Sequence, residues 1–553
     1  MSDEKTPGDS RKTPKVSLVA VLVVLAAVVI GAGLGAFAYR VHLTGEDDFT
    51  ASTVEASTAE ASTGGITNTG APGARFDAQF NTDTMYPAFS PDRHFYVTRC
   101  VPGKVNVQVN ALDGSTVKVG PYPPRSGRFA AEARPLPGQD FTIRVATEGT
   151  EPQDYKLRCL PDDFPEWDYT RLKEPPTGMF VVSFRPEPKQ LMRNWVVVFD
   201  QDGTPRWWFS PESNTLGGQI LSDGTVQWPR GFGDGFGKDS RTGNEVRTLD
   251  GRLLRVLKTE DAPTDGHEFT ELPNGNVLIN SYKPRLGVDL TAVGGEEDSG
   301  VLDGEIQEVT PSGKVVWKWN SGDHVPLDYT PQRWWNKVLR NPHTDIEGNQ
   351  RYDIFHFNSV EPWGRDQLVI SSRHTDKVFG ISRRSGEILW TFGGEPDPKS
   401  LKVLGDDPFG DYPIGGNHDA RISDGNLLSI HDNRTNLGQP PRAVRYRIDL
   451  ENRTATYEGQ NVDPKARRSH CCGGVRPFGD GWLVAWGNNP IVTAFNADDQ
   501  IAFRLGLPIP VYRAVPVPPS VTADDLDRGL DRMEPEPPMS KVPLKPIVEY
   551  ETD

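Results

Sequence analysis

A turn followed by a short apolar strand rich in aromatic residues recurs along the middle of the chain. From the first copy to the sixth the average spacing is about 59 residues, longer than typical propeller repeats but enough for four strands and long loops. A second apolar strand, preceded by a turn such as Asn274-Gly275, comes before most copies. This pattern predicts an all-β fold with a six-bladed β-propeller over 171–513. The copies begin at Gly203, Gly251, Gly313, Gly386, Arg453 and Asp499.

A different pattern precedes this region. Between 75 and 170, apolar and polar residues alternate with period two, as from Val105 to Val109 and from Phe141 to Val145, and Pro/Gly turns separate the runs. Alternation of this kind is typical of strands with one buried face. We predict a small β-sandwich domain here.

The N-terminal region contains 24 residues without a charge, at 16–39. A helix of that length spans a bilayer core of about 30 Å, so we predict one transmembrane helix. Basic residues gather in 1–15 and acidic ones follow Arg40. This bias places the N-terminus in the cytoplasm and the rest of the chain outside. The alternative is a cleaved signal peptide, suggested by Ala36-Phe37-Ala38, which would leave a secreted or periplasmic protein.

Two further segments lack the pattern of a packed core. Residues 40–74 are mostly small and polar, which predicts a flexible Ser/Thr/Gly-rich stalk. Residues 514–553 are rich in proline and acidic residues, and we expect an extended or mobile tail.

The charge balance excludes one class of partner. The chain has 60 Lys+Arg against 76 Asp+Glu, a formal net charge of -16. Proteins that bind nucleic acid gain affinity by neutralising phosphates, so a nucleic-acid partner is not expected.

Four cysteines suit an oxidising compartment. We predict a disulfide between Cys100 and Cys159, which lie in two strand-like segments and would close a loop of about 60 residues. For the adjacent Cys471 and Cys472 three alternatives stay open: a vicinal disulfide, two buried thiols or metal ligands. No matching pair of further ligands is evident, so no metal site is predicted.

Histidines are concentrated in the predicted propeller. Four of them lie just before, or at the start of, a blade's inner strand: His267, His356, His418 and His470. A single histidine is more often a structural hydrogen-bonding residue. Four in the same phase of the repeat predict a shared site at the propeller axis.

Several motifs in this region resemble a known family. Together they are similar to the six-bladed arylsulfate sulfotransferases (arylsulfotransferases), most clearly over 265–490. The anchor indicates a divergent, membrane-anchored branch. The motifs are His-Phe-Asn-Ser-Val at 356–360, Ser-Ser-Arg-His at 371–374, Gly-Glu-Ile-Leu-Trp-Thr-Phe-Gly-Gly at 386–394 and His-Asp-Ala-Arg at 418–421.

The resemblance implies transfer of a sulfuryl group from a phenolic sulfate ester to a phenol through a sulfated histidine, with no metal or cofactor. His418 matches the nucleophile. The residues matching groups that hold the sulfuryl oxygens or move protons are His267, His356, Asn358 and Arg373. We also expect His374 and His470 to contact the substrate.

The residue chemistry agrees with this scheme. Only a neutral imidazole has the lone pair that a nucleophile needs, so His418 must stay unprotonated. The guanidinium of Arg373, the amide of Asn358 and the imidazole of His356 are suitable donors for sulfuryl oxygens. His267 is a candidate general acid and base. The structural alternatives are a salt-bridge role for Arg373 and a blade-locking amide for Asn358.

Two other functions compete with this one. A non-catalytic propeller that binds an anionic ligand or a cell-envelope partner would tolerate loss of the lone pair of His418. A quinoprotein dehydrogenase shares Gly-x-x-x-Trp strands and a vicinal disulfide, but it has eight blades and a calcium site. The oligomeric state, the donor and the acceptor are not predictable from the sequence.

Overall fold

The computed structural model describes residues 76–534, apart from 81–83, 91, 101–104, 137, 185–192, 214, 232–236, 238 and 345–347. The predicted cytoplasmic segment 1–15, transmembrane helix 16–39 and stalk 40–74 lie outside the described residues, as does 535–553 of the predicted tail. No helix in the described part of the chain has the length and apolar character that a bilayer crossing requires.

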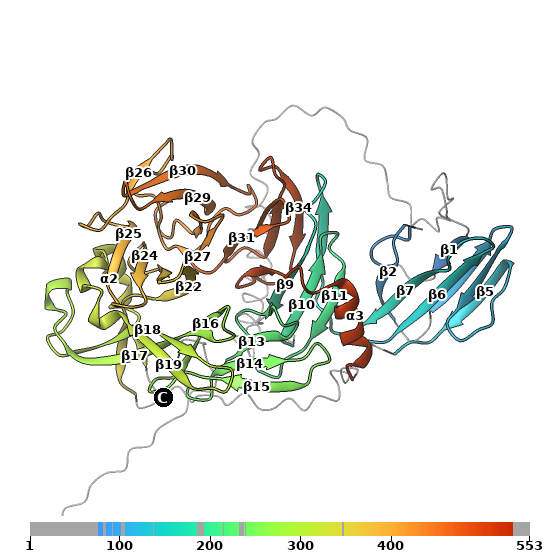
Figure 1. The fold of residues 1–553 in the computed structure, drawn as a ribbon, viewed down its shortest axis with the longest axis horizontal. Helices are drawn as coiled ribbons and strands as arrows, with labels where there is room; N and C mark the ends of the chain where they lie inside the picture. The colour runs from blue at the N-terminus through green and yellow to red at the C-terminus, as the bar shows by residue number, and fades with distance from the viewer. Residues whose placement is uncertain are drawn as a thin grey trace, which may run out of the picture. The chain divides into compact units, whose positions relative to one another are not determined.

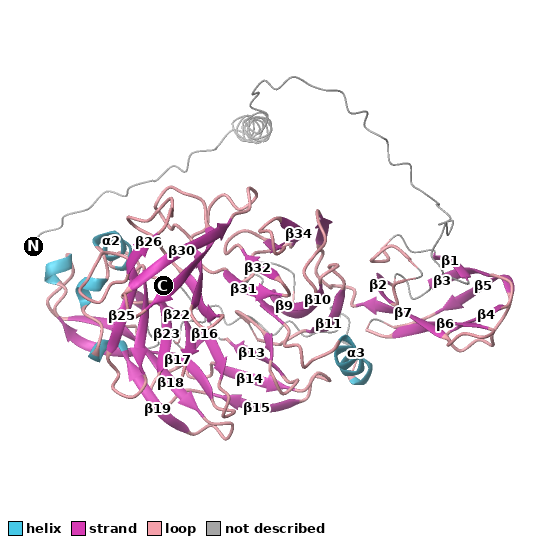
Figure 2. Cartoon of the chain, turned by 45° about the horizontal axis from the view of Figure 1, so that its top comes forward, coloured by secondary structure: helices cyan, strands magenta, loops and turns pink. Residues whose placement is uncertain are grey.

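Strands dominate the described residues, which confirms the all-β class (Figure 2). Residues 76–160 form two sheets, β1-β3-β5 and β2-β7-β6-β4. Both sheets contribute to one hydrophobic core, which includes Phe76, Val107, Val117 and Ile143. The strands are β1 (Phe76–Phe80), β2 (Phe95–Arg99), β3 (Val105–Ala111), β4 (Ser115–Val119), β5 (Gly127–Ala133), β6 (Asp140–Thr147) and β7 (Gln153–Leu160).

The predicted disulfide is present in this part of the chain. Cys100 and Cys159 are bonded, with their Cα atoms 5.5 Å apart. Cys159 lies in β7, and Cys100 directly follows β2, its parallel neighbour in the sheet. The bond therefore connects two adjacent strands that are far apart in the sequence.

From residue 179 onward, six sheets of at least four strands lie around a common centre (Figure 1). The strands are β9 (Met179–Phe184), β10 (Trp195–Asp200), β11 (Pro205–Phe209), β12 (Gln219–Ile220), β13 (Val226–Arg230), β14 (Gly243–Arg247), β15 (Leu253–Leu257), β16 (Thr264–Glu271), β17 (Val277–Val288), β18 (Ser299–Val309), β19 (Val315–Asn320), β22 (Phe357–Trp363), β23 (Gln367–Ser372), β24 (Lys377–Ser382), β25 (Ile388–Gly393), β27 (His418–Ser423), β28 (Leu427–Asp432), β29 (Arg442–Asp449), β30 (Thr454–Asn461), β31 (Gly474–Phe478), β32 (Gly481–Ala485), β33 (Ile491–Phe495), β34 (Ile501–Gly506) and β35 (Ala514–Pro516).

The aromatic repeat found in the sequence corresponds to one strand in each sheet, namely β11, β15, β19, β25, β30 and β34. Later in the chain, β35 joins the first sheet, and β20 and β21 join the third. The tryptophans of the repeat connect neighbouring sheets. In β11 the indole N–H of Trp207 donates to the carbonyl of Leu249, 2.8 Å away, just before β15. In β19 Trp319 donates to the carbonyl of Gly386, also at 2.8 Å, before β25. The aromatic positions thus repeat because each sheet packs on the next in the same way.

The predicted tail is corrected at its start. Residues 514–516 form β35, which pairs with β9 and completes the first sheet. The C-terminal strand therefore closes the ring of sheets. Helix α3 (Ala523–Arg532) follows, with a capping box between Thr522 and Asp525 and with Leu526 and Leu530 buried. Proline-rich composition alone did not reveal these two elements.

A second correction concerns the boundary at 170. Strand β8 (Asp168–Arg171) falls largely within the predicted sandwich range, yet it pairs with β34 at the edge of the sixth sheet. A similar edge strand, β26 (Lys402–Leu404), extends the fifth sheet.

The connection between β19 and β22 is long. It runs beside the site described below, and the sequence pattern did not predict its elements. They are η2 (Ser321–Asp323), η3 (Leu327–Tyr329), α2 (Gln332–Val338), β20 (His343–Thr344) and β21 (Gln350–Asp353), and η1 (Thr291–Val293) lies between β17 and β18.

Candidate active site

The innermost strands of three consecutive sheets are irregular where a histidine occurs. The pairing register shifts between Thr264 and Phe269 in β16, between Phe357 and Ser359 in β22, and between His418 and Arg421 in β27. Such bulges re-aim side chains and are common beside functional sites. The predicted phase of His267, His356 and His418 therefore has a local structural basis.

At the start of two of these strands, one residue adopts a backbone conformation that is unfavourable for residues with a side chain. His356 has φ of 52° and Asp419, next to His418, has φ of 55°. Left-handed φ values at residues other than glycine cost free energy, and they cluster at functional sites.

Two of the histidines are oriented by a carboxylate. Nδ1 of His267 lies 2.8 Å from Asp265, and Nδ1 of His356 lies 2.5 Å from Asp353. Each aspartate also accepts the backbone N–H of its histidine. A carboxylate only accepts hydrogen bonds, so Nδ1 carries the proton and Nε2 points away.

Burial affects these pairs in different ways. It raises the pKa of Asp265, although the contact with His267 opposes the shift. For Asp353 burial also acts upward, but the interactions with His356 lower its pKa below the usual range. Burial lowers the pKa of His356 to about 4 in spite of Asp353, so this ring is neutral at pH 7.

His418 has a different partner. Its Nδ1 lies 2.6 Å from the carbonyl oxygen of Gly473, the residue before β31. Burial, and then the charge of Arg513, lower the pKa of His418 well below its ordinary value. A carbonyl only accepts, so the proton resides on Nδ1 and the lone pair on Nε2. The ring is in the state that a nucleophile requires.

Aromatic contacts join the three histidines into one buried cluster. The ring centres of His267 and His356 are 4.9 Å apart. Tyr512 lies 4.9 Å from His418 and 5.8 Å from His267, and its hydroxyl donates to the carbonyl of His267 at 3.2 Å. Tyr282 lies 6.4 Å from His356. Residues that are far apart in the sequence thus line a single site.

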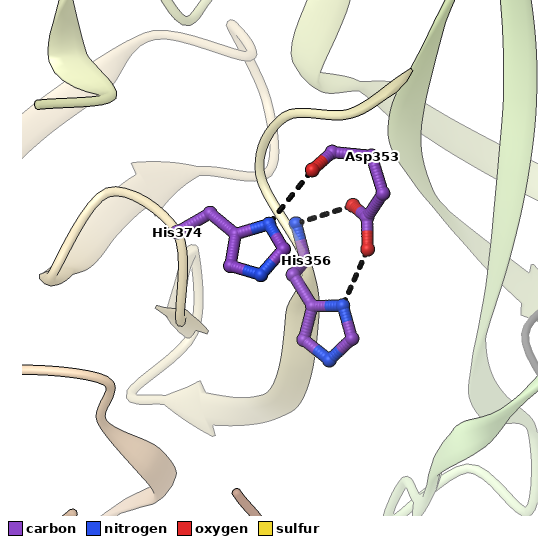
Figure 3. Close-up of side chains that lie close together, drawn as sticks. All are labelled: Asp353, His356 and His374. Carbon is purple, nitrogen blue, oxygen red and sulfur yellow. Dashed lines mark hydrogen bonds and ion pairs between the residues drawn. The ribbon is translucent and has the colours of Figure 1, made fainter. Parts of the chain in front are cut away.

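Arg373 and His374 adjoin this cluster. Figure 3 shows Asp353 in contact with both imidazoles: its carboxylate accepts from His356, and its backbone carbonyl accepts from Nδ1 of His374 at 2.7 Å. Nε2 of His374 in turn accepts from the guanidinium of Arg373, 2.9 Å away. Both nitrogens of His374 are therefore used in the chain that orients Arg373.

The same three residues are the one group among the described residues with the spacing of a metal site. Ligand atoms of Asp353, His356 and His374 lie within 4.8 Å of one another. Nε2 of His374, however, accepts from Arg373, and Nδ1 of His356 is held by the carboxylate. To bind His374, a metal ion would have to displace the guanidinium of Arg373 from Nε2, and the two positive charges would repel each other. The donor set fits a hydrogen-bond network better than a metal site.

The side-chain amide of Asn358 contacts the backbone on both sides of His418. Its Nδ2 donates to the carbonyl of Asn417 at 3.0 Å, and its Oδ1 accepts the N–H of Asp419 at 3.1 Å. The side chain is fully buried. These contacts match the blade-locking alternative, in which Asn358 positions the backbone around His418, and the substrate contact of Asn358 stays a prediction.

His470 also departs from the expectation. Its side chain is exposed, and its backbone carbonyl accepts from Arg373. The residue precedes β31 as predicted, but the loop before this strand contributes main-chain groups to the site.

The two adjacent cysteines stand as free thiols beside the cluster. A hydrogen bond from Cys472, followed by the charge of Arg373, lowers the pKa of Cys471 to about 6 against the effect of burial. Of the three alternatives left open by the sequence, the structure has two thiols, both only partly buried.

A buried ionic network supports the strand that starts with His418. Asp419 contacts Arg421 and Arg476 at 2.8 Å and Arg513 at 3.2 Å. Glu268 contacts Arg421 at 2.7 Å. Burial acts upward on the pKa of Asp419, but these cations hold it well below its usual value. Removing one partner of a buried ion pair lowers the free energy of unfolding by about 3 to 5 kcal/mol, so this network holds β27 in place.

Several residues of the site are not apparent from the sequence pattern. Tyr282, Tyr512 and Arg513 follow no repeat, and only folding brings them to the cluster. Asp265 and Asp353 do have a sequence signal, because each lies two or three residues before a histidine and bonds its backbone N–H.

A family model described as Arylsulfotransferase (ASST) matches residues 217–506, more than half of the chain. The match includes β16, β22, β27 and β31. No curated protein shows significant similarity to the chain.

Several solved structures are similar over part of the chain. A protein of unknown function from Bacteroides caccae is 12% identical, with 62% of this chain and 99% of that chain covered and a TM-score of 0.36. A putative 6-phosphogluconolactonase from Bacteroides fragilis is 13% identical, with 62% and 98% covered and a TM-score of 0.34. The β-propeller domain of Swd1 from Myceliophteria thermophila is 11% identical, with 62% and 86% covered and a TM-score of 0.32. Similarities of this size carry no argument about this chain.

Proposed function

The chain belongs to the arylsulfotransferase family, and we propose that it transfers a sulfuryl group from an aryl sulfate to a phenolic acceptor through a sulfated His418. The observation that carries this proposal is the neutral imidazole of His418, whose Nδ1 is held by the carbonyl of Gly473. Because the proton is fixed on Nδ1, the lone pair of Nε2 is available for attack.

In the first half-reaction, Nε2 of His418 attacks the sulfur while the bond from sulfur to the aryl oxygen breaks. The electron pair of that bond leaves with the aryloxide, which takes a proton from His267. Asp265 holds His267 by Nδ1, so Nε2 is the nitrogen that exchanges this proton.

The sulfuryl oxygens need fixed hydrogen-bond donors. Arg373 is suitable, because His374 and the carbonyl of His470 orient its guanidinium. Its Nε is buried and has no hydrogen-bond partner among the described residues. A buried N–H without a partner costs free energy, which an incoming sulfuryl oxygen would recover.

In the second half-reaction, a phenol gives its proton to His267 and its oxygen attacks the sulfur. The bond from sulfur to Nε2 breaks, and His418 returns to its neutral state. Asn358 keeps the backbone around His418 in place during both steps.

We also propose that the six sheets act as the blades of a propeller and that residues 16–39 anchor the chain with its C-terminal part outside the cytoplasm. The disulfide between Cys100 and Cys159 supports an oxidising compartment. Protease protection of membrane vesicles that contain the full-length protein tests the orientation.

The test of function uses the purified full-length protein with p-nitrophenyl sulfate, with and without phenol. We expect nitrophenol release that depends on phenol, and a labile adduct of one sulfuryl group at His418 in a peptide map. His418→Ala should abolish both, whereas His94→Ala, at an exposed position, should change neither. Release that persists in His418→Ala would reject the covalent scheme. If none of a broad set of aryl sulfate donors releases its phenol, the result would favour the non-catalytic propeller that binds an anionic ligand or a cell-envelope partner.

A further inference from the structure

Three cations surround one tryptophan beside the site. Trp334, in α2, is buried, and three cationic groups lie near its ring: Arg333 at 4.8 Å, Arg373 at 4.7 Å and Lys337 at 5.1 Å. The ring of His374 lies 4.5 Å from the same indole. The electron-rich face of a tryptophan favours such contacts, but it does not replace a counterion.

The three cations differ in their partners. Arg333 is paired with the carboxylate of Asp376, 2.8 Å from its Nε. Within the described residues, neither Arg373 nor Lys337 forms an ion pair with a carboxylate, and Nε of Arg373 is buried without a hydrogen-bond partner. Two neighbouring positive charges are thus left without a carboxylate counterion.

The environment of Lys337 shows the effect of this arrangement. Its side chain is half-buried, and burial followed by the charge of Arg373 lowers the pKa of its ammonium group to about 8. The thiol of Cys471 acts in the opposite direction and raises this pKa, whereas Arg333 adds to the repulsion. A solvated surface lysine would not have this environment. An anion placed between Lys337 and Arg373 would relieve the repulsion.

We propose that Lys337 and Arg373 together bind a donor whose aromatic ring carries a second anionic group, such as a carboxylate, in addition to its sulfate. This inference rests on the proposed function. An aryl sulfate monoester has a single negative charge, which Arg373 can meet alone. Both cations lie near the same indole, and the charge of Arg373 acts on Lys337, so the two groups are close enough for one aromatic ring with two anionic substituents to contact both. Trp334 contacts both Lys337 and Arg373. It lies in the connection between β19 and β22, outside the repeated strands.

The binding test uses unreactive arenesulfonates, so that it does not depend on turnover. Isothermal titration of the full-length protein at 0.15 M salt compares 4-sulfobenzoate, with two anionic groups, and 4-toluenesulfonate, with one. We expect the wild type to bind 4-sulfobenzoate at least ten-fold more tightly. Lys337→Met should reduce this preference to less than three-fold, and Lys337→Arg should keep most of it. Lys314→Met, at an exposed position, is the matched control and should behave as the wild type.

A kinetic test completes the design. In Lys337→Met we expect kcat/KM for 4-carboxyphenyl sulfate to fall at least ten-fold, with a change of less than three-fold for phenyl sulfate. Equal binding of the two sulfonates by the wild type, or a preference that survives in Lys337→Met, would overturn the inference. If the preference depends on Lys337 but no donor turns over, the anion site stands and the proposed activity fails. Thermal unfolding of each variant verifies that it is folded.

Discussion

His418 donates its Nδ1–H to the carbonyl of Gly473 at 2.6 Å, across the boundary between the fifth and sixth sheets. The other two histidines of the cluster instead have an aspartate at Nδ1. Burial leaves both His418 and His356 neutral, even though the contact with Asp353 acts to raise the pKa of His356. The partner at Nδ1 instead fixes which ring nitrogen carries the proton, and in His418 it leaves the lone pair on Nε2.

The lowered pKa of His418 predicts the pH dependence of the first half-reaction. An imidazolium has no lone pair, and the pKa of His418 lies well below its ordinary value, so the ring stays neutral as the pH falls through 6.5. The burst rate with p-nitrophenyl sulfate, whose leaving group needs little acid assistance, should be constant between pH 8 and 6. Rapid-mixing absorbance measures it. A loss of rate with a midpoint near 6.5 would show that His418 is not the buried neutral group described here.

The contact between Asp265 and His267 predicts a selective defect. Asp265→Asn keeps a side chain of the same size but removes the charge, and it can leave the ring in the wrong tautomer. We expect kcat to fall about 10- to 100-fold with phenyl sulfate, whose leaving group needs the acid. The p-nitrophenyl sulfate burst should change less than three-fold. Asp261→Asn, at an exposed position, is the control, and equal losses for both donors would argue against an acid–base role.

The buried neutral histidines predict a loss of stability in acid. Burial lowers the pKa of His356 and of His431 to about 4. Between pH 6.5 and 4 the unfolded chain binds protons at these positions and the folded chain does not, so the free energy of unfolding decreases as the pH falls. Each residue contributes about 2 kcal/mol between pH 7.5 and 5. Denaturant unfolding at both pH values measures the change.

His431→Leu isolates one of these contributions. The variant should reduce the difference in unfolding free energy between pH 7.5 and 5 by about 2 kcal/mol, because it removes one group that binds protons in the unfolded state. An unchanged difference would mean that His431 titrates normally in the folded protein.

The lowered pKa of Cys471 predicts a reactive thiol. With a pKa of about 6, most of this thiol is ionised at pH 7, and it is partly exposed. Alkylation by iodoacetamide, followed by peptide mass, should be half-maximal near pH 6. The variant Cys472→Ser changes the main hydrogen bond to Cys471. In this variant the pH of half-maximal alkylation should move away from 6. Alkylation only above pH 8 in the wild type would contradict the described environment.

The bond between Cys100 and Cys159 predicts a localised stability effect. The double variant Cys100→Ala/Cys159→Ala should lower the unfolding free energy of the N-terminal sheets by about 4 kcal/mol, since the bond closes a loop of 59 residues. Differential scanning calorimetry measures it. A non-reducing peptide map that found both residues as free thiols would remove the basis of this prediction.

The all-β class and the strands of the aromatic repeat were predictable from the sequence, because they depend on local periodicity. The disulfide was predicted from two cysteines in strand-like segments of a chain expected in an oxidising compartment. The repeat also predicted the phase of three histidines: His418 begins β27, His356 precedes β22 and His267 lies within β16. The start of the tail was not predicted, since β35 is a strand only because β9 lies beside it.

The sequence by itself determined which residue types are available and where each lies in its repeat. Only the tertiary structure decided their roles: Asn358 holds the backbone around His418, the side chain of His470 is exposed, and Tyr512 connects His418 to His267. The physical reason is that the ring nitrogen that carries the proton, and the counterion of each charged side chain, depend on groups brought together from several sheets. Local sequence periodicity carries no information about those contacts.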